Sequence, residues 1–493
     1  MLKRRSFIRS LFAAAALPSI ARAAVPARIV IPAKATGAVI PPTLISLSYE
    51  TDNLVDPRFF NAANTGLVRQ FRRLNPDGIL RLGGNTSDLA RLAGFQGTLP
   101  VLHPLYRDKE RVQPYYDVTP EALDALAGFL DATGWKVIFG LNMRADNADM
   151  VAQFAAIVRA KLGSRLLSLQ IGNEANNYHR AYDQFHAAWE RLGRRINRGD
   201  LSGPDSGANT DWVQRFSRDV PDAVLLSRHY YRDAADKGSL DDILRHDHDF
   251  DRDIALLARA GRSHAHGFWL TEVNSYYRGG LDGVSNAFAS ALWGLDFALS
   301  AACHGATGLC FQGGPRRSIE SSLEGHKTGG ANAANADIVA RIDAVTSNYS
   351  PIGGDLDTGF AARPLYYGLV MARQLAGHRF YVLENADALP DVRVYATAAP
   401  DGSVRIVAIN TSQHTARTPG FSGLKAGRAV QAAPLRAPSL TARTALTFGS
   451  DSGTLEPGAE WQLRYTSVAP VSASGALDVA LPAGSAVLLH VQA

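Results

Sequence analysis

The sequence predicts an α/β protein, a (β/α)₈ TIM barrel followed by a C-terminal β-sandwich domain. Three observations predict this fold. Short apolar runs alternate with helical patterns from about residue 44 to 312, which is typical of a parallel sheet wrapped by helices. The runs number eight, as a closed barrel of this kind requires. Beyond residue 380 the pattern is strand-like throughout, with Gly, Pro and Ser turns. A doubly wound sheet is the alternative, but no Gly-x-Gly-x-x-Gly turn follows the first run.

The predicted barrel strands are short, and most of their residues are apolar. They are the segments 43–49, 78–82, 135–141, 166–171, 201–203, 224–229, 267–270 and 305–311. Apolar residues at helical spacing predict helices between them. The main helix candidates are 120–133, 148–161, 178–196 and 285–302.

Changes in composition divide the remainder of the chain. We expect the barrel to span residues 44–375, with a loop insertion at 313–350 that is too long for an idle connection and that covers the barrel mouth. The sandwich is expected over 376–493, and the segment 25–43 contains a strand candidate, 27–31, that joins it. The sandwich strands are predicted at 392–397, 404–410, 461–466 and 486–491.

Residues 1–24 have the form of an export signal. A basic start precedes an apolar run over 11–20, and a small-residue cleavage site follows. The run is about half of the ~20 residues that cross a bilayer. Arg4 and Arg5, with Phe7 two places on, are typical of a twin-arginine signal, and a general secretory signal is the alternative. We therefore expect a periplasmic or secreted protein that does not contact a membrane once the signal is removed.

Charge and cysteine usage exclude several classes of protein. The chain has 51 Lys and Arg against 46 Asp and Glu, but five of the bases lie in the signal, so the mature charge is balanced. This balance argues against a nucleic-acid partner. Cys303 and Cys310 are too few for a disulfide framework, and we expect two small core residues, a disulfide being the alternative. No zinc, P-loop or EF-hand spacing occurs, so we expect no metal and no cofactor. The sequence gives no oligomeric state.

Two glutamates follow strands at the end of the barrel where catalysis takes place. Glu174 follows the fourth predicted strand and Glu272 the seventh. Each alone is typical of a helix N-cap or a solvated turn. Together they match glycoside cleavage with retention, which needs two carboxyl groups about 5 to 5.5 Å apart. Asn173, directly before Glu174, is placed to bind a sugar hydroxyl.

Four motifs narrow this chemistry. In chain order they are Leu-Arg-Leu-Gly-Gly-Asn-Thr-Ser-Asp at 80–88, Val-Ile-Phe-Gly-Leu-Asn at 137–142, Gln-Ile-Gly-Asn-Glu-Ala-Asn at 170–176, and Thr-Glu at 271–272 followed by Tyr-Arg-Gly-Gly at 277–280. The sequence resembles clan A retaining glycosidases, and within that clan it resembles family 79 glycoside hydrolases, the β-glucuronidases and heparanase-like enzymes. That family also has a C-terminal β-sandwich that takes an N-terminal strand.

The resemblance implies a role for each matching position. It implies that Glu174 is the acid/base and Glu272 the nucleophile. Mutual repulsion and the polar partners of Glu272 are expected to keep Glu174 protonated and Glu272 ionised in the resting enzyme. The substrate-binding residues it implies are Asn173 on the 2-hydroxyl, Glu50 on the distal hydroxyls, Asn85 of the first motif, and Tyr277 with the amides of Gly279 and Gly280 on the uronic carboxylate. Glycines allow backbone donors to approach an anion closely. A surface acid before a turn is the alternative for Glu50.

His229 and Tyr231 end the sixth predicted strand. Residues two apart share one face of a strand, so both are expected to point into the barrel. We expect Tyr231 to donate a hydrogen bond to Glu272 and keep it ionised. A buried aromatic pair in the core is the alternative.

The chain departs from the resembled family at two places. Family members use a tyrosine after the eighth strand against the carboxylate, but here no tyrosine occurs between that strand and Tyr349. Either Tyr349 returns to the site or Arg316 or Arg317 takes the role, and we favour Tyr349. Arg278 stands where heparanase-like sequences have a glycine, which leaves the local loop geometry open.

Two further patterns have a structural explanation. The segment 246–253 contains His and Asp residues of metal-ligand type, but it begins a predicted helix and is expected to be a solvated face. The segment 203–207 is similar to a serine nucleophile turn, yet no partnered His and Asp can be assigned.

The sequence therefore predicts an exo-acting retaining β-glucuronidase whose partner is a glucuronide-containing glycoside or oligosaccharide. The alternatives are an endo-acting heparanase-like enzyme and a non-catalytic carbohydrate-binding barrel. Endo action requires an open cleft with basic subsites, so the balanced charge and the insertion at 313–350 favour the exo mode. A silent binding protein is expected to lose one carboxylate, and both are present.

Overall fold

The computed structural model describes residues 28–328, 337–449 and 463–493. Its centre is a closed barrel of eight parallel strands, which confirms the predicted (β/α)₈ fold. The strands follow chain order around the barrel, and the last pairs with the first. They are β2 (Ile45–Glu50), β3 (Ile79–Gly83), β6 (Lys136–Leu141), β7 (Leu166–Ile171), β8 (Leu201–Ser206), β9 (Leu226–Ala234), β10 (Phe268–Tyr277) and β11 (Gly308–Gly313).

Three barrel strands run further than the apolar pattern predicts. β8 continues to Ser206, β9 to Ala234 and β10 to Tyr277. Their extensions contain polar and charged residues, so alternation of apolar residues could not mark them as strands. The extension of β8 and most of that of β10 are buried, whereas residues 231–233 of β9 are half-buried and Tyr277 is exposed. Glu272 stands in register with His229. The extensions carry the polar side chains of β8, β9 and β10 to the barrel mouth.

The helices cover the outside of the barrel, and their starts have recognisable caps. Asn147 and Asn209 each accept a hydrogen bond from the backbone of the first turn, and Gly134 ends α2 in the left-handed conformation. The helices of the barrel are α1 (Thr65–Leu74), α2 (Pro120–Thr133), α3 (Ala148–Leu162), α4 (Tyr182–Gly193), α5 (Thr210–Asp219), α6 (Leu240–Leu244), α7 (His248–Gly261), α8 (Phe288–Cys303) and α11 (Pro364–Arg373).

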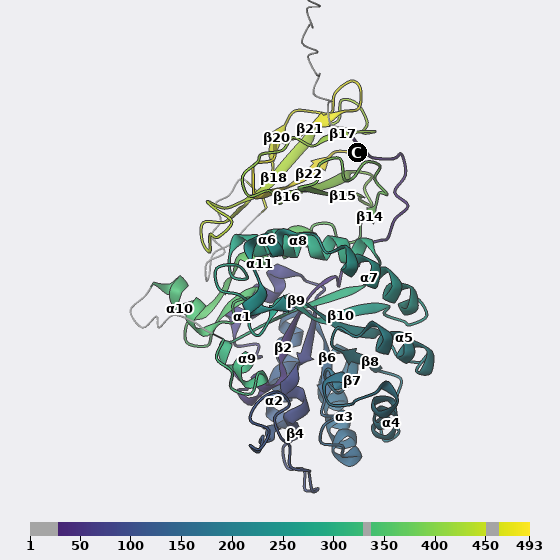
Figure 1. The fold of residues 1–493 in the computed structure, drawn as a ribbon, viewed down its shortest axis with the longest axis vertical. Coiled ribbons are helices and arrows are strands. Elements are labelled where there is room, and N and C mark those ends of the chain that lie inside the picture. Colours follow the sequence, from purple (N-terminus) through teal and green to yellow (C-terminus); the bar gives the residue numbers. More distant parts are fainter. Residues whose placement is uncertain (1–27, 329–336, 450–462) are drawn as a thin grey trace, which may run out of the picture.

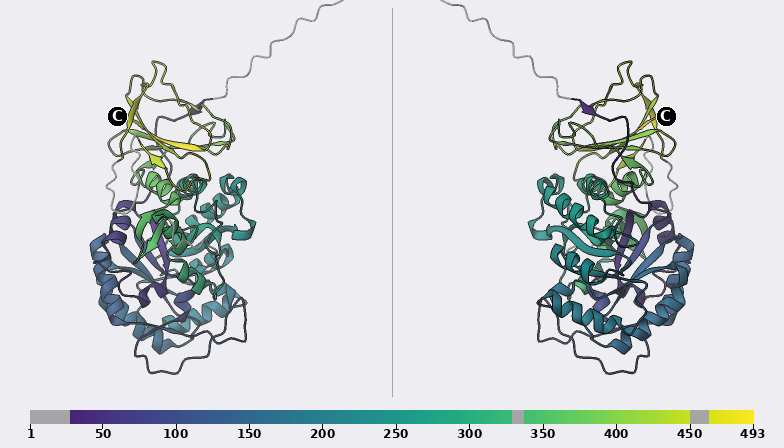
Figure 2. Two further views of the ribbon diagram at one scale, coloured as in Figure 1. Left: turned by 90° about the vertical axis from the view of Figure 1, so that its left-hand side faces the viewer. Right: turned by 90° about the vertical axis from the view of Figure 1, so that its right-hand side faces the viewer.

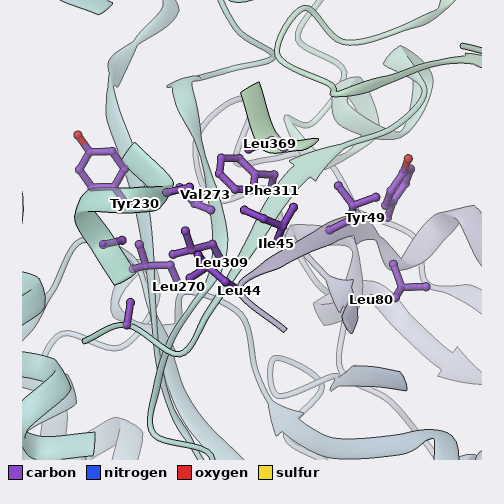
Figure 3. Packing of buried hydrophobic residues seen from close by; sticks show 14 of the residues in the cluster. Leu44, Ile45, Tyr49, Leu80, Tyr230, Leu270, Val273, Leu309, Phe311 and Leu369 are labelled. Carbon is purple, nitrogen blue, oxygen red and sulfur yellow. The ribbon is translucent and has the colours of Figure 1, made fainter. Parts of the chain in front are cut away.

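The main core lies between the strands and this ring of helices. Figure 3 shows part of it, with Leu270, Val273, Leu309 and Phe311 of neighbouring strands packed together. These four side chains are fully buried. Each contributes roughly 1.5–3 kcal/mol when removed from water. This packing gives the polar groups at the barrel mouth a rigid support.

Two antiparallel sheet regions form the C-terminal part. A seven-stranded sheet has the order β14-β15-β16-β22-β18-β19, with β20 paired to β18, and a three-stranded sheet has the order β1-β17-β21. β1 (Ile29–Val30) pairs in parallel with β17 and brings the N-terminal segment into this region. The other strands are β14 (Arg379–Phe380), β15 (Val392–Ala398), β16 (Val404–Asn410), β17 (Gly420–Ser422), β18 (Val430–Arg436), β19 (Thr447–Phe448), β20 (Thr466–Val468), β21 (Leu477–Asp478) and β22 (Ser485–Val491).

The two sheets share a second apolar core, which includes Ile29 and Phe421 from the small sheet and Ile406 from the large one. Figures 1 and 2 show this sandwich stacked on one side of the barrel, over α6, α8 and α11. The predicted strand 461–466 lies partly outside the described residues, and the strand observed there begins at Thr466.

The segment after β11 contains helices as well as loop. α9 (Arg316–Ser322) and α10 (Ile338–Val345) lie in it, and residues 329–336 are outside the described part. Pro315 and Thr346 form a bridge that closes the excursion, and the hairpin of β12 (Ile352–Asp355) and β13 (Gly359–Ala362) follows. β4 (Ala90–Leu92) and β5 (Tyr116–Val118) form one more small pair, on the crossover from β3 to β6.

The structure also bears on the two cysteines, on the predicted signal and on membrane-spanning helices. Both cysteines are free; Cys310 is buried as expected, but Cys303 is exposed, because it occupies the last position of α8. The predicted signal at residues 1–24 lies outside the described residues. Within the described ranges, no helix combines the length and apolar character that a bilayer span requires.

Candidate active site

A cavity of about 480 Å³ opens at the carboxyl ends of the barrel strands. This volume falls in the range of small-molecule sites. Eight of the eleven predicted site residues line this cavity. The predicted residues that line it are Glu50, Asn85, Glu174, His229, Tyr231, Glu272, Tyr277 and Tyr349.

Glu174 and Glu272 face the same imidazole. The Nδ1 atom of His229 lies 2.9 Å from Oε1 of Glu174 and 3.9 Å from Oε2 of Glu272. Two carboxylates that contact one nitrogen atom are within reach of the roughly 5–5.5 Å separation of a retaining pair. The barrel thus brings together, from β10 and from the turn after β7, the two residues that the sequence paired.

Glu174 has an unusual backbone conformation. Its φ is 43°, in the left-handed region, and its N–H donates to the carbonyl of Asp205 at 2.9 Å. Gly172, two residues earlier, has φ 88°, and a Cβ there would meet Met143 at 2.8 Å. This tight turn directs the Glu174 side chain across the cavity, where it is strained but held by its neighbours.

A buried ion cluster lies under the two glutamates. Arg81 is 1% exposed and donates to Oε2 of Glu272 at 2.7 Å and to Oδ2 of Asp205 at 2.6 Å. Asp205 also accepts from His229 at 3.1 Å and from Thr271 at 2.5 Å. Buried charges persist only when they are paired and hydrogen-bonded, as these are. The cluster holds Glu272 in one orientation.

The charges in this cluster shift several pKa values. Burial lowers the pKa of His229, but the neighbouring carboxylates of Asp205 and Glu272, with the hydrogen bonds that the ring donates to Asp205 and Glu174, outweigh it and raise the pKa to about 10. Burial raises the pKa of Glu174, but the hydrogen bond and charge of His229 outweigh it and lower the pKa. These two directions favour a proton on His229 over one on Glu174, against the expectation that Glu174 is protonated in the resting protein.

Glu50 lies at the far wall of the cavity and is buried. Its Oε2 accepts from the backbone N–H and the hydroxyl of Thr86 at 3.1 and 2.7 Å, and its Oε1 accepts from Gln312 at 3.2 Å. Burial, followed by the charge of Glu272, raises its pKa to about 8. A protonated carboxyl can both donate to and accept from a hydroxyl group. The surface position considered as the alternative for Glu50 is excluded.

Asn173 is not on the main cavity wall. Its Oδ1 accepts from Arg81 at 2.7 Å, and its amide donates to Oδ1 of Asn85 at 3.1 Å. It lines a small adjoining cavity instead, which Asn85 shares. Both polar ends of the Asn173 side chain are thus engaged, and they connect Arg81 with Asn85.

Three tyrosines form one side of the cavity. Tyr231 donates to Oε1 of Glu272 at 2.8 Å, as expected from the strand pattern. Its ring centroid lies 6.3 Å from that of Tyr277 and 6.1 Å from that of Tyr349. Tyr349 is 3% exposed and lines the cavity, whereas Arg316 donates to a carbonyl of α10 outside it. Of the alternatives left open by the sequence, Tyr349 is the one that returns to the site.

Gly279 and Gly280 adjoin these tyrosines. Both have positive φ, 85° and 83°, and a Cβ on Gly280 would meet the backbone of Tyr349 at 2.8 Å, so the loop needs glycine there. Both residues are buried, and neither backbone N–H donates to an acceptor in the described part of the chain. Buried N–H groups nearly always have a partner. Within the described residues, these two N–H groups are free to donate to a ligand.

Arg363 anchors the segment that delivers Tyr349. Its guanidinium donates to the carbonyls of Ser347 and Ser350 at 2.5 and 3.4 Å and to Asp343 at 3.0 Å. From the barrel side, Asn274 donates to the carbonyl of Tyr349 at 3.0 Å. The return of the 313–350 insertion is thus fixed from two directions.

The segment with metal-ligand residue types differs in part from expectation. Ligand atoms of His246, His248 and Asp251 lie within 4.8 Å of one another. His248 and Asp249 are exposed, as a solvated face requires, whereas His246 and Asp251 are only partly exposed. The two ring nitrogens of His246 lie 2.8 Å from Asp296 and 2.7 Å from Asp251. Burial lowers its pKa, but these bonds outweigh burial and raise the pKa to about 10. Both ring nitrogens of His246 are thus engaged by carboxylates, and Asp296 also accepts from Tyr395 of the sandwich at 2.7 Å.

The sequence missed several groups of the site. Arg81 had a signal, since it is a charged residue within an apolar strand. Asp205 lies in the segment discounted as a serine turn, and the hydroxyl of Ser206 there only donates to a backbone carbonyl. Tyr106 and Asn177 gave no signal, because they lie in irregular segments. Asn177 donates to Oε2 of Glu174 and to the hydroxyl of Tyr106, both at 2.9 Å.

Comparison with known proteins bears on the fold. No family model matches the chain, and no curated protein matches it. Among solved structures, a 4-O-α-L-rhamnosyl-β-D-glucuronidase from Fusarium oxysporum 12S has a TM-score of 0.68 at 17% identity, over 93% of this chain and 99% of that chain. A GH51 arabinofuranosidase from Xanthomonas axonopodis pv. citri has a TM-score of 0.60 at 14% identity, over 94% and 100%. A GH30 endoxylanase from Clostridium papyrosolvens C71 has a TM-score of 0.52 at 13% identity, over 95% and 100%. The likeness shows that all share one fold.

Proposed function

We propose that the protein is a retaining glycoside hydrolase of clan A. The observation that carries this proposal is the pair of carboxylates, Glu174 and Glu272, on one imidazole in a cavity of sugar-sized volume. Within the clan, the motifs favour a family 79 β-glucuronidase, and the fold shared with a solved glucuronidase supports that assignment.

In this mechanism Glu272 is the nucleophile. Arg81 and Tyr231 each donate to one of its oxygens, which fixes the carboxylate for attack on the anomeric carbon. Attack forms a glycosyl ester on Glu272 and breaks the bond to the leaving oxygen, which takes a proton from Glu174. Water then attacks the ester while Glu174 accepts its proton.

The proton reaches Glu174 from His229. The negative charge of Glu272 helps to hold the proton on the imidazole. As Glu272 forms its ester that charge disappears, so the pKa of His229 falls. The proton can then move along the 2.9 Å contact to Glu174 at the moment when the leaving oxygen needs it.

The glycone is a β-linked glucuronic acid. The amides of Gly279 and Gly280, which have no acceptor in the described residues, and the hydroxyls of Tyr277 and Tyr349 supply donors for its carboxylate. Glu50 supplies both a donor and an acceptor for the distal hydroxyls. A charge-assisted bond of this type contributes on the order of 1.5–3 kcal/mol, enough to select a uronate over a neutral sugar.

Exo action is the mode that the insertion supports. Ile319, Ser322, Leu323 and His326, which belong to the insertion, line the cavity, and this supports a pocket over an open cleft. Endo action requires an open cleft. Incubation with an acidic polymer separates the two: released monosaccharide supports exo action, and internal fragments assign the protein to the heparanase-like mode. Shortening the insertion between Ser318 and Asn335 should shift the products from released monosaccharide toward internal fragments.

We further propose that the protein is exported through its N-terminal signal and acts in the periplasm or outside the cell. Its partner is a glucuronide-containing glycoside or oligosaccharide. Fractionation of cells that express the full chain tests the export, and a Lys pair in place of Arg4 and Arg5 should retain the protein in the cytoplasm.

A substrate panel tests the function directly. The protein should release 4-nitrophenol from its β-glucuronide much faster than from the β-glucoside or the β-xyloside. Faster cleavage of either neutral glycoside would overturn the uronate assignment. Binding of glucuronides without release of the phenol would favour a silent carbohydrate-binding barrel.

A further inference from the structure

A long loop of the β3 to β6 crossover reaches the cavity from outside the barrel. We call residues 93–115, between β4 and β5, the strap. β4 marks its base in Figure 1, at the end of the molecule away from the sandwich. The strap is closed on itself by a bridge between Leu102 and Gln113, and at its tip Tyr106 and Arg107 line the cavity.

Glu324, at the end of the insertion's first helical stretch, fixes the tip of the strap. Its carboxylate accepts the backbone N–H groups of Leu105, Tyr106 at 3.1 Å and Arg107 at 2.9 Å. Arg111 donates to the carbonyl of Glu324 at 3.3 Å. Three amides on one carboxylate satisfy its charge and set the position of the strap. Tyr106 and Arg107 are therefore held at the cavity wall by a dedicated contact.

The strap reaches the cavity on the side of Glu174. Asn177 donates to both the Tyr106 hydroxyl and Oε2 of Glu174, each at 2.9 Å. In a retaining hydrolase the acid/base lies beside the leaving oxygen. Glu50 and the three cavity tyrosines belong to other elements of the barrel. Tyr106 and Arg107 therefore lie on the side of the cavity from which the leaving group departs.

The two side chains have the chemistry of a recognition surface. Tyr106 is 49% exposed although it lines the cavity, so an aromatic ring is presented to a ligand. Arg107 is exposed, and in the described ranges no ion pair involves its guanidinium. A guanidinium binds a carboxylate through two parallel hydrogen bonds.

We propose that Tyr106 and Arg107 form a leaving-group subsite for a ring-shaped aglycone that carries an acidic group. The ring of the aglycone lies against Tyr106, and its anion pairs with Arg107. This inference rests on the proposed function, because it takes Glu174 as the acid/base.

The test uses a pair of aryl β-glucuronides that differ in one charge, the 4-carboxyphenyl glycoside and the neutral 4-carbamoylphenyl glycoside. Arg107→Gln should lower kcat/KM about two- to fivefold on the first and leave the second unchanged, as expected for an exposed charge pair. Tyr106→Ala should lower kcat/KM about tenfold on both, while Tyr106→Phe, which keeps the ring, should retain most of it. Tyr115→Ala is the matched control, since Tyr115 belongs to the strap but bonds to Pro100 outside the cavity.

A second readout separates recognition from a structural effect. The leaving group has departed before the glycosyl ester is hydrolysed, so kcat on 2,4-dinitrophenyl β-glucuronide, where that hydrolysis limits the rate, should not change in Tyr106→Ala. A fall in this kcat would mean that Tyr106 positions Glu174 through Asn177 and would overturn the subsite. Equal losses on the charged and neutral substrates in Arg107→Gln would overturn the acidic aglycone.

The same aglycone pair mounted on β-xylose distinguishes failure of this inference from failure of the proposed function. Cleavage of the xylosides alone, with the Arg107-dependent preference retained, overturns the glucuronide assignment and supports the subsite. Cleavage of the glucuronides without that preference overturns the subsite and supports the glucuronide assignment.

Discussion

The Nδ1 atom of His229 lies 2.9 Å from Oε1 of Glu174, so the acid/base candidate shares its proton with an imidazole. Together the two groups hold one proton up to the pH at which His229 loses it, and the pKa of His229 is raised to about 10. Moving this proton between them does not change the total charge. The reactive form with protonated Glu174 is thus available over the whole range below that pH.

His229→Gln should move the alkaline limb of the kcat/KM profile to lower pH by at least about one unit. Glu174 then becomes the only proton store, and a lone carboxyl loses its proton at lower pH than the pair. Glu50 is present in both proteins, so its titration does not contribute to the difference between their two pH profiles. The limb should disappear for the 2,4-dinitrophenyl glycoside, which needs no protonation. An alkaline limb at the same pH in both proteins would show that His229 does not store the proton.

The two glutamates should differ when each is removed. Glu272→Gln should abolish turnover for all substrates, because the nucleophilic charge is lost whatever the leaving group. Glu174→Ala should retain glycosylation by activated leaving groups, and added azide should restore turnover with release of the β-glycosyl azide. Product analysis by NMR checks this outcome. An α-azide would be incompatible with retention.

Tyr277→Phe and Tyr349→Phe should each lower kcat/KM on the 4-nitrophenyl glucuronide roughly ten- to a hundredfold, because a charge-assisted hydrogen bond to the carboxylate is lost. Activity on the xyloside, which has no carboxylate, should barely change. Arg316→Ala and Arg317→Ala are the controls and should alter the glucuronide rate only slightly, since neither side chain lines the cavity. Equal losses on both glycosides would remove these tyrosines from uronate recognition.

Glu50 should make stability fall as pH rises. Its pKa is raised from 4.5 to about 8 in the folded protein, so the stability it contributes is complete below about pH 4.5 and is lost as pH rises through 8. Glu50→Gln stays neutral, and its free energy of unfolding relative to the wild type should increase over this range, on the order of a few kcal/mol. Urea denaturation across pH 4.5–9 measures the difference. A difference that does not vary with pH would contradict the buried protonated carboxyl.

The fold and the centre of the site follow from the sequence because they depend on local patterns. Apolar runs mark the eight strands, and strand ends locate Glu174, Glu272 and His229 at one end of the barrel. Asp205 and Arg81 could be assigned no role, since their importance arises from contact between distant strands. The tip of the strap, at Tyr106, is likewise placed by Glu324, more than two hundred residues away. The protonation of Glu174 was predicted from its repulsion by Glu272 and from the polar partners of Glu272, whereas the contact with His229 lowers the pKa of Glu174.

The configuration of the first product tests the central claim, double displacement by Glu174 and Glu272, most directly. Proton NMR during cleavage of 4-nitrophenyl β-glucuronide distinguishes the anomers before they interconvert. The two carboxylates that contact one imidazole nitrogen match a retaining pair. This arrangement predicts that β-glucuronic acid appears first and that the α anomer forms later by mutarotation. Initial release of the α anomer would show single displacement and would contradict the assignment of Glu272 as the nucleophile.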